Sequence, residues 1–415
     1  MTQLETMGAN ARQAARILMN AGAKKDEALL SIAKALRDNA QTIIEANDID
    51  IENGKAAGLT ASLLDRLKLD EKRILGMADG VTQVAAMPDP IGRVLEGRTL
   101  KNGLQIEKVT VPMGVIGIIY EARPNVTSDA AALCLKAGSA VILRGGKEAI
   151  NSNKAITAVM RDAIESAGLP RDCVSLITDT TRQSATELMQ LTEYLDVLIP
   201  RGGAGLIKSV VANAKVPVIE TGVGNCHVYV DKSADIEMAA NIIYNAKTSR
   251  PSVCNAIETI LVHKDIAAQA LPVIKAALDE KNVELRGCER TRAILGDCVV
   301  PVTENDYAVE FLDYILAVRV VDSLDDALDH LAKYSTGHSE CIVTSDYAAA
   351  NRFTAGVDSA AVYVNASTRF TDGGEFGLGA EIGISTQKLH ARGPMGLNEL
   401  TSMKFIIRGE GQVRI

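Results

Sequence analysis

The feature that most constrains the fold is a series of short apolar segments, separated by stretches of helical length, that begins at Val115. Such alternation predicts strands buried in a parallel sheet with helices on both of its faces. The first series comprises 115–120, 140–143, 174–178, 195–199 and 217–219. The second comprises 257–262, 315–321, 340–344 and 361–364. Two such series in a chain of 415 residues predict an α/β fold of two abutting domains.

A different pattern precedes the first series. Apolar residues such as Leu29, Ile32 and Leu36 recur at helical spacing, and Pro88 and Pro90 mark the end of this helical region. A turn then follows with Asn102-Gly103 at its tip, and apolar and polar residues alternate over 105–111. This arrangement predicts a β-hairpin.

Composition excludes several classes of protein. Hydrophobic residues make up 47% and charged residues 23% of the chain, and its longest apolar runs are too short to cross a bilayer. A net charge of −8 disfavours a nucleic-acid partner. The N-terminus lacks the pattern of a signal peptide, which predicts a cytoplasmic protein. Seven irregularly spaced cysteines predict neither a disulfide framework nor a zinc site.

One of these cysteines, Cys254, lies in a polar, cationic segment that leads into the apolar run 257–262. Pro251 should end any helix running in from Ile236, which places Cys254 on a turn where backbone N–H groups can hold a developing negative charge. Arg250 favours the thiolate over the thiol. Cys254 is therefore a candidate nucleophile, although most cysteines are small buried hydrophobic residues.

Two glycine turns with cations follow predicted strands. Arg144-Gly145-Gly146-Lys147 follows the strand 140–143 and so lies at the carboxyl edge of the predicted parallel sheet. Nucleotides usually bind at this edge. Gly202-Gly203 follows 195–199 and opens a predicted helix, whose N-terminus can hold a phosphate. Neither turn matches G-x-G-x-x-G, and either could be an ordinary tight turn. Two such turns after strands of the same series favour a nucleotide site.

A third glycine cluster, 220–227, lies between the two strand series. Glu220 could act as a general base or lie solvated at a strand end, and His227 is more often structural than catalytic in such a setting. The five histidines show no ligand spacing, so no metal site is predicted.

The segment 364–396 is long for a loop, and long loops in compact domains are usually functional. It supplies cations that an acidic protein needs in order to bind an anionic substrate, namely Arg369, Lys388, His390 and Arg392. A solvated glycine-rich connection is the alternative.

Four segments together are characteristic of one protein family: 120–127, 199–206, 250–255 and 362–396. With them the chain resembles the aldehyde dehydrogenase superfamily over nearly its whole length, and within it the branch that reduces gamma-glutamyl phosphate. The resemblance implies a Rossmann-like NADP-binding domain over 1–225 and a catalytic domain over 226–397. It also implies an oligomerisation arm formed by the 93–111 hairpin and the C-terminal strand in 398–415.

The implied reaction is the NADPH-dependent reduction of L-glutamyl 5-phosphate to L-glutamate 5-semialdehyde and phosphate, the second step of proline biosynthesis. Cys254 would attack the acyl phosphate, and the thioacyl enzyme would accept a hydride. The resemblance implies that the Cys254 backbone N–H and the Asn125 side chain stabilise the oxyanion. It also implies that Glu310 binds the nicotinamide ribose. Arg250 and Arg392 are the first choices for the phosphate.

Cofactor preference follows from Lys147, which stands where NAD-using members of the superfamily carry a glutamate. A lysine there, with Arg144 nearby, attracts the 2′-phosphate of NADPH. Gly202 and Gly203 would face the cofactor phosphates. The resemblance further suggests a homo-oligomer and a functional association with glutamate 5-kinase, with no nucleic-acid or membrane partner.

Three alternatives stay open at this point. A hydrolytic aldehyde dehydrogenase would release the same thioester with water, using Glu220 as its base. A cysteine hydrolase or amidotransferase would pair Cys254 with His227 and bind no nicotinamide. A non-catalytic oligomeric scaffold is the third, and the two phosphate-suited turns disfavour both of the last two.

Overall fold

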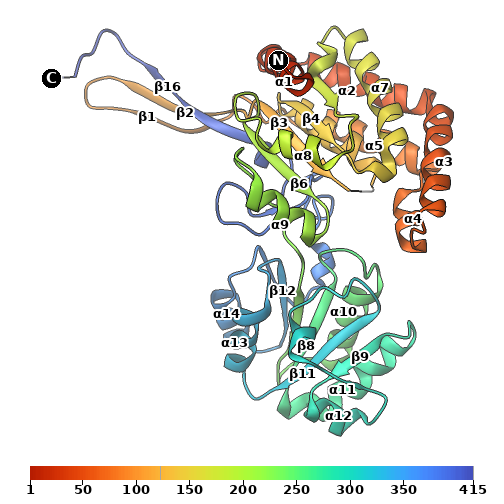
Figure 1. The fold of residues 1–415 in the computed structure, drawn as a ribbon. Coiled ribbons are helices and arrows are strands. Elements are labelled where there is room, and N and C mark those ends of the chain that lie inside the picture. Colours follow the sequence, from red (N-terminus) through yellow and green to blue (C-terminus); the bar gives the residue numbers. More distant parts are fainter. Residues whose placement is uncertain (122, 415) are drawn as a thin grey trace. The chain divides into compact units, whose positions relative to one another are not determined.

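The computed structural model describes residues 1–121 and 123–414, apart from the side chain of Ser62. Ala122 of the 120–127 motif and Ile415 of the predicted arm lie outside the described residues. The chain forms two compact units (Figure 1). Unit 1 comprises Met1–Thr221, Gly377–Gly383 and the chain from Met395 onward, and unit 2 comprises Gly222–Phe376 and Ile384–Pro394.

The N-terminal region of unit 1 is helical, as the spacing of its apolar residues predicts. Its helices are α1 (Gln3–Leu18), α2 (Lys24–Asp38), α3 (Ala40–Ala56), α4 (Ala61–Leu67) and α5 (Glu71–Ala86). A capping box starts α1, because Thr2 accepts the N–H of Glu5 while the Glu5 side chain accepts the N–H of Thr2. Leu29, Ile32 and Leu36 form the buried stripe of α2.

The main sheet of unit 1 is parallel and has the strand order β5-β4-β3-β6. Its strands are β3 (Val115–Tyr120), β4 (Ala140–Arg144), β5 (Val174–Leu176) and β6 (Val197–Arg201). Its further helices are α6 (Asn125–Lys136), η1 (Lys147–Ala149), α7 (Ile150–Ser166), η2 (Arg171–Cys173), α8 (Arg182–Met189) and α9 (Ala204–Asn213). The strands that were predicted at 115–120, 140–143, 174–178 and 195–199 all form, with small shifts at their ends.

The prediction of a strand at 217–219 is wrong. Only an isolated bridge forms there, between Val218 and Leu198. Pro217 has no N–H to donate to a ladder, and the glycine cluster 220–227 follows this segment directly. The chain is therefore free to leave the sheet at this point.

The predicted hairpin forms as β1 (Val94–Thr99) and β2 (Gln105–Pro112), and its turn contains Gly103 at φ +86°. The C-terminal strand β16 (Thr401–Arg408), which follows η5 (Asn398–Leu400), pairs antiparallel with β2. Figure 1 shows the three strands side by side. The sheet joins segments that are far apart in the sequence, since Arg408 pairs with Gln105 and Thr401 with Pro112.

Unit 2 contains a larger sheet with the strand order β10-β9-β11-β8-β7-β12-β13, in which every pairing is parallel. Its strands are β7 (Cys226–Val230), β8 (Ile257–His263), β9 (Glu284–Gly287), β10 (Val300–Pro301), β11 (Ile315–Val321), β12 (Ser339–Val343) and β13 (Ala361–Val364). A small antiparallel pair consists of β14 (Ile384–Ser385) and β15 (Gly393–Pro394). The strands predicted for the second series form, whereas β7, β9 and β10 were not predicted.

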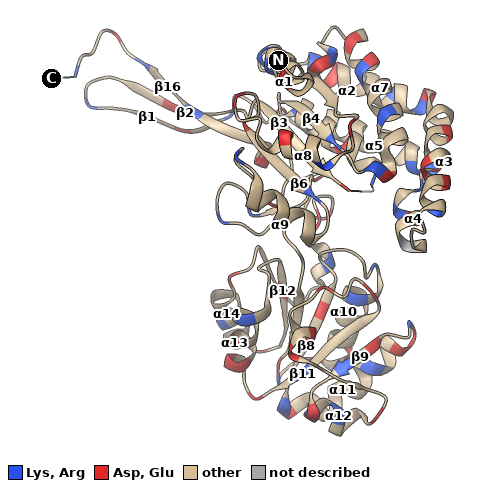
Figure 2. Ribbon diagram, in the orientation of Figure 1, with Lys and Arg blue, Asp and Glu red and all other residues tan. Residues whose placement is uncertain are grey.

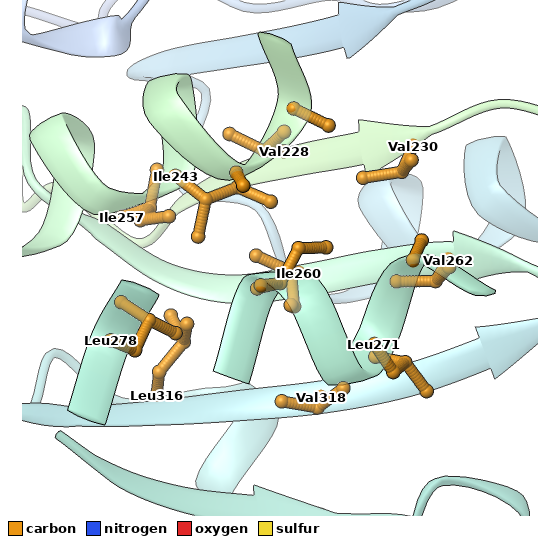
Figure 3. Packing of buried hydrophobic residues seen from close by; sticks show 14 of the residues in the cluster. Val228, Val230, Ile243, Ile257, Ile260, Val262, Leu271, Leu278, Leu316 and Val318 are labelled. Carbon is orange, nitrogen blue, oxygen red and sulfur yellow. The ribbon is translucent and has the colours of Figure 1, made fainter. Parts of the chain in front are cut away.

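Helices cover both faces of the unit 2 sheet. They are α10 (Ile236–Thr248), α11 (Lys264–Asp279), α12 (Glu289–Leu295), η3 (Glu304–Tyr307), α13 (Leu324–Tyr334), α14 (Tyr347–Gly356) and η4 (Thr368–Phe370). Figure 3 shows side chains of β7, β8 and β11, with Ile260 among them, packed against side chains of α10 and α11, with Leu271 among them. Leu261 faces the opposite side, where it packs with Phe353 of α14. Alternate residues of β8 therefore serve two cores.

The C-terminal part of the chain alternates between the units. Gly377–Gly383 belong to unit 1, Ile384–Pro394 to unit 2, and Met395 onward again to unit 1. The first change of unit, between Thr221 and Gly222, lies four residues before the domain boundary expected after 225. Figure 2 shows cationic and anionic residues mixed along the helices, so the net negative charge is distributed over the chain.

Candidate active site

The segment that carries Cys254 connects α10 to β8, as predicted from Pro251. The helix ends at Thr248 and the strand begins at Ile257. A proline disfavours helical backbone at the residue before it, which accounts for the end of α10 ahead of Pro251. Cys254 lies in this turn and is half-buried. Its position at the start of a central strand fixes the turn against the core of unit 2.

The backbone of Cys254 packs directly against Gly224. A Cβ added to Gly224 would lie 1.5 Å from the Cys254 carbonyl oxygen, so no other residue fits there without moving the turn. The thiol of Cys226 donates to the same carbonyl oxygen across 3.1 Å. Burial raises the pKa of Cys226 well above its usual value, and Cys226 is therefore a neutral packing partner of the turn.

Asn255 ties the Cys254 turn to the tail. Its side-chain amide donates to the carbonyl oxygen of Thr371 at 2.9 Å and to that of Arg369 at 3.3 Å. Its own carbonyl oxygen accepts the Thr368 hydroxyl at 2.7 Å. The Arg369 guanidinium donates in turn to the Asn255 side-chain oxygen and, at 3.0 Å, to the Ser249 hydroxyl. The fold thereby holds the Arg369 side chain over the turn.

Arg250 and Cys254 both act electrostatically on Arg369. Burial lowers the pKa of Arg369, and the positive charge of Arg250 lowers it further, while Asp372 and Cys254 oppose the change. Arg250 itself is exposed. Two guanidinium groups thus lie within electrostatic range of each other beside the cysteine, and this arrangement suits an anionic ligand.

The other cations of the tail have a different partner. Lys388 lies 2.5 Å from a carboxylate oxygen of Asp358, and Arg392 contacts the other oxygen at 2.9 Å and the Asp358 carbonyl at 2.8 Å. These two cations lower the pKa of Asp358. His390 is exposed and has φ +67°. Asp358 already uses two of the five N–H donors of Arg392.

Glu310 contacts Gly224, the glycine that packs against the Cys254 turn. Its carboxylate accepts the N–H of Gly224 at 2.6 Å, and burial raises its pKa while this hydrogen bond lowers it. A second buried carboxylate, that of Glu258, lies 2.6 Å from Lys247 with both side chains 0% exposed. Burial raises the pKa of Glu258 and lowers that of Lys247, and each charge opposes the shift of the other.

His227 occupies a structural position on β7. The Glu340 carboxylate accepts the backbone N–H of His227 at 2.8 Å and is hydrogen-bonded to its Nδ1 at 3.0 Å. The ring of His227 packs edge-on against that of His330. The side chain is fully buried. Glu220, at the end of unit 1, is half-buried.

The turn after β4 places two cations differently. Lys147 opens η1 and is exposed, so it can reach a ligand at the carboxyl edge of the sheet. Arg144 donates to the carbonyl oxygens of Thr180 and Thr181 at 2.7 and 2.9 Å, and burial lowers its pKa. Arg144 therefore holds the 180–181 loop in place, and Lys147 is the more accessible cation of this turn.

The N-terminus of α9 already binds an anion, the Glu121 carboxylate. It accepts the N–H of Gly203 at 2.8 Å, and it packs so closely that a Cβ on Gly202 would lie 2.6 Å from it. This contact is of the kind that a helix N-terminus favours, because its free N–H groups attract negative charge. A cofactor phosphate at Gly202 and Gly203 would have to displace Glu121.

Asn125 is the first residue of α6, and its side-chain amide donates to Asp129 at 2.9 Å within that helix. Burial raises the pKa of Asp129 to about 6, against the effect of this hydrogen bond. Asn125 is exposed, so its amide is accessible at the start of the helix.

Sequence reasoning missed Asn255, Glu121, Lys247 and Glu258. Glu258 carried a usable signal, because a glutamate inside the apolar run 257–262 must be paired if that strand is buried. Lys247 carried a similar one, since its spacing from Ile243 places it on the buried face of α10. Asn255 and Glu121 had no comparable signal.

Two kinds of feature are absent from the described residues. They contain no group of three or more His, Cys, Asp or Glu side chains arranged to hold a metal ion. None of their helices is both long and apolar enough to cross a membrane.

Comparison with known proteins places these features in a family. The model of the aldehyde dehydrogenase family matches residues 2–291. The gamma-glutamyl phosphate reductase of Moorella thermoacetica is 61% identical over 413 residues, covering 99% of both chains. That of Carboxydothermus hydrogenoformans is 60% identical over 415 residues, covering 100% of both.

Solved structures agree with the sequence comparisons. The crystal structure of gamma-glutamyl phosphate reductase from Thermotoga maritima matches with a TM-score of 0.97 at 51% identity, covering 100% of both chains. An acetylating aldehyde dehydrogenase from Geobacillus thermoglucosidasius has the same fold, with a TM-score of 0.71 at 18% identity, covering 100% of this chain and 98% of the other. The chain therefore belongs to the aldehyde dehydrogenase family of oxidoreductases, which use a nicotinamide cofactor.

Proposed function

We propose that this protein reduces L-glutamyl 5-phosphate to L-glutamate 5-semialdehyde and phosphate with NADPH, the second step of proline biosynthesis. The names of relatives at about 60% identity over the whole chain support this reaction. The structural observation that carries it is the Cys254 turn, with Arg250 and Arg369 within electrostatic range of each other beside it. A cysteine next to two guanidiniums suits an acyl phosphate, which is both electrophilic and anionic.

Cys254 is the nucleophile in this proposal. Its thiolate sulfur attacks the acyl carbon and forms a tetrahedral oxyanion, and the carbon–oxygen bond to phosphate then breaks with its electron pair on the departing phosphate. Backbone N–H groups of the turn are the first donors to that oxyanion, with Asn125 as a further proposed donor. The product of this half-reaction is a thioester at Cys254, which accepts hydride more readily than a carboxylate would.

The anionic groups of the substrate need cations. Arg369 is held in place by Asn255 and Ser249, and a side chain that is already ordered loses less entropy when it binds. Arg250 is exposed and adds a second charge from the other end of the turn. Lys388, His390 and Arg392 remain candidates for the α-carboxylate or the phosphate, although Asp358 already holds Lys388 and Arg392.

A nicotinamide cofactor, when bound, supplies the hydride that reduces the thioester. The residues proposed to hold it are Arg144, Lys147, Gly202, Gly203 and Glu310. Two observations fit such a ligand: Lys147 is an exposed cation at the carboxyl edge of a parallel sheet, and the α9 N-terminus binds a carboxylate. A lysine in place of an acid favours the 2′-phosphate of NADPH over NADH.

The roles of the two units follow from this assignment. Unit 1 is proposed to bind NADP and unit 2 to carry the chemistry at Cys254. The β1–β2–β16 sheet is proposed as an oligomerisation arm, because Met403, Phe405 and Ile407 alternate along an edge strand with more than half of each side chain exposed, at 54%, 55% and 56%. A homo-oligomer would cover these residues.

A cytoplasmic location and a functional association with glutamate 5-kinase complete the proposal. None of the cysteines forms a disulfide in the described residues, which suits a reducing compartment. A kinase that makes an acyl phosphate supplies a labile substrate, and proximity to the reductase would limit its loss to water.

The test runs the reaction backwards. Purified protein is mixed with glutamate semialdehyde and NADP, with and without phosphate, and NADPH formation is recorded by absorbance. Steady turnover that depends on phosphate supports the proposal. Turnover that is independent of phosphate would show a hydrolytic aldehyde dehydrogenase instead.

A further inference from the structure

An ion pair that the mechanism above does not use joins the helix before the Cys254 turn to the strand after it. Lys247, in the last turn of α10, lies 2.6 Å from Glu258, the second residue of β8, and both side chains are 0% exposed. A buried ion pair is weak support for stability, because the cost of desolvating two charges can exceed their attraction. An apolar pair could fill the same space, so this pair calls for an explanation other than stability.

The second carboxylate oxygen of Glu258 provides such an explanation for the buried pair. It accepts the backbone N–H of Leu312 at 3.3 Å. Leu312 has φ +55°, a conformation that residues other than glycine rarely adopt and that persists only when the surroundings hold it. Lys247 fixes one oxygen of Glu258, and the other is thereby turned toward Leu312. An apolar residue at 258 would have no acceptor to offer this N–H group.

The strained turn at Leu312 is connected to the proposed nucleophile, Cys254, through Glu310 and Gly224. Glu310, two residues earlier, accepts the N–H of Gly224 at 2.6 Å. Gly224 in turn lies flush against the carbonyl group of Cys254. The contacts therefore form a closed circuit within unit 2 that runs through Lys247, Glu258, Leu312, Glu310, Gly224 and Cys254.

We propose that Lys247 and Glu258 are positioning residues that hold the Cys254 turn and the Glu310 carboxylate in one rigid frame. The proposal rests on the proposed function for the roles of Cys254 and Glu310. The pair sets the base of the turn through α10 and β8, and it sets the position of Glu310 through Leu312. Neither residue needs to touch the substrate, since its effect is transmitted through the backbone.

The experiment replaces the pair by apolar residues of similar size, in the double variant Lys247→Met/Glu258→Leu. Removing both charges avoids a lone buried charge, so the variant should fold, and its thermal midpoint should fall only by the cost of the lost hydrogen bond to the Leu312 N–H. The rate at which iodoacetamide alkylates Cys254, followed by mass spectrometry of its peptide without substrate or cofactor, should fall by about tenfold or more. kcat should fall with it, and the Kd of NADPH should rise because Glu310 is displaced.

A matched control removes an exposed pair from the same unit. Lys275 and Asp279 on α11 form an i,i+4 ion pair at 2.6 Å, and Lys275→Met/Asp279→Leu should leave all three readouts within about twofold. If the double variant at 247 and 258 also keeps Cys254 alkylation and NADPH affinity within about twofold, the pair only fills space and the proposal is overturned.

A second measurement decides the matter if the double variant does not fold. Hydrogen exchange of Glu258→Gln is compared with the wild type in the peptides that contain Gly224 and Leu312. The frame predicts faster exchange at both amides together, because they belong to one circuit. Exchange that changes at Leu312 and not at Gly224 would contradict it. Alkylation and exchange need no turnover, so this outcome is independent of whether the proposed reaction is correct.

Discussion

Cys226 lies directly behind Cys254 and donates a hydrogen bond from its thiol to the Cys254 carbonyl oxygen at 3.1 Å. The two cysteines differ in environment: Cys226 is fully buried and its pKa is raised by that burial, whereas Cys254 lies half-buried in a turn beside cations. One is a packing residue of the turn and the other is the proposed nucleophile. Their separate replacement therefore tests the central assignment.

Cys254→Ala should abolish hydride transfer, because the thioester cannot form. NADPH affinity, measured by fluorescence titration of a chain that contains no Trp, should stay within a few-fold of wild type. Cys226→Ala should retain turnover, with some loss of stability from the missing hydrogen bond. If Cys226→Ala is inactive while Cys254→Ala turns over normally, the wrong sulfur has been chosen.

Lys147→Glu should weaken NADPH selectively. A charge-assisted hydrogen bond to the 2′-phosphate is worth about 1.5–3 kcal/mol, and its replacement by repulsion should cost at least tenfold in Kd while NADH is little affected. Lys154→Glu, at another exposed lysine a little further along the chain, is the matched control. An unchanged preference between the two cofactors in Lys147→Glu would refute the assignment.

Phosphate should be the acceptor of the thioester when the reaction runs backwards. Without phosphate, semialdehyde and NADP should give a burst of about one NADPH per active site and then stop. Glu220→Gln should leave phosphate-dependent turnover within about tenfold, since a true general base contributes roughly 10²–10⁴-fold. Steady turnover in phosphate-free buffer that Glu220→Gln removes would identify a hydrolytic enzyme.

Arg369→Ala should raise the KM for phosphate by about tenfold or more in this direction, because it removes an ordered guanidinium from beside Cys254. Arg392→Ala should have a much smaller effect, since Asp358 already holds that side chain. Initial rates over a range of phosphate concentrations measure both. A larger effect from Arg392→Ala would show that the Asp358 contact breaks when the anion binds.

Gly224→Ala should inactivate the enzyme even though Gly224 carries no chemistry. The new methyl group would lie 1.5 Å from the Cys254 carbonyl oxygen, so the turn must move. Alkylation of Cys254 and turnover should both fall, with about 1–3 kcal/mol of lost stability. Gly76→Ala on α5 is the control, because a Cβ there meets no atom of the described residues within 4 Å and alanine favours a helix. Normal alkylation in Gly224→Ala would mean that the turn is more tolerant than its packing indicates.

Much of the fold could be predicted because it depends on local pattern. The apolar strands of both series, the helical N-terminus and the Asn102-Gly103 hairpin follow from residue spacing and turn chemistry. β7 was not predicted, because a glycine cluster precedes it and the polar His227 interrupts its short apolar run. The predicted strand at 217–219 did not form, because Pro217 has no N–H to donate to a ladder, and only an isolated bridge joins Val218 to Leu198.

The sequence by itself determined that Cys254 lies on a turn between a helix and a strand, because Pro251 and the apolar run after it act on the adjacent backbone. Only the tertiary structure decided which side chains share that turn. Arg369 meets Asn255 across 114 positions, and Arg392 meets Asp358 across 34. Four cations in one long loop are equivalent in the sequence. Folding distinguishes them, because Arg369 pairs with the Asn255 amide, whereas Lys388 and Arg392 pair with the Asp358 carboxylate that the packed elements bring within reach.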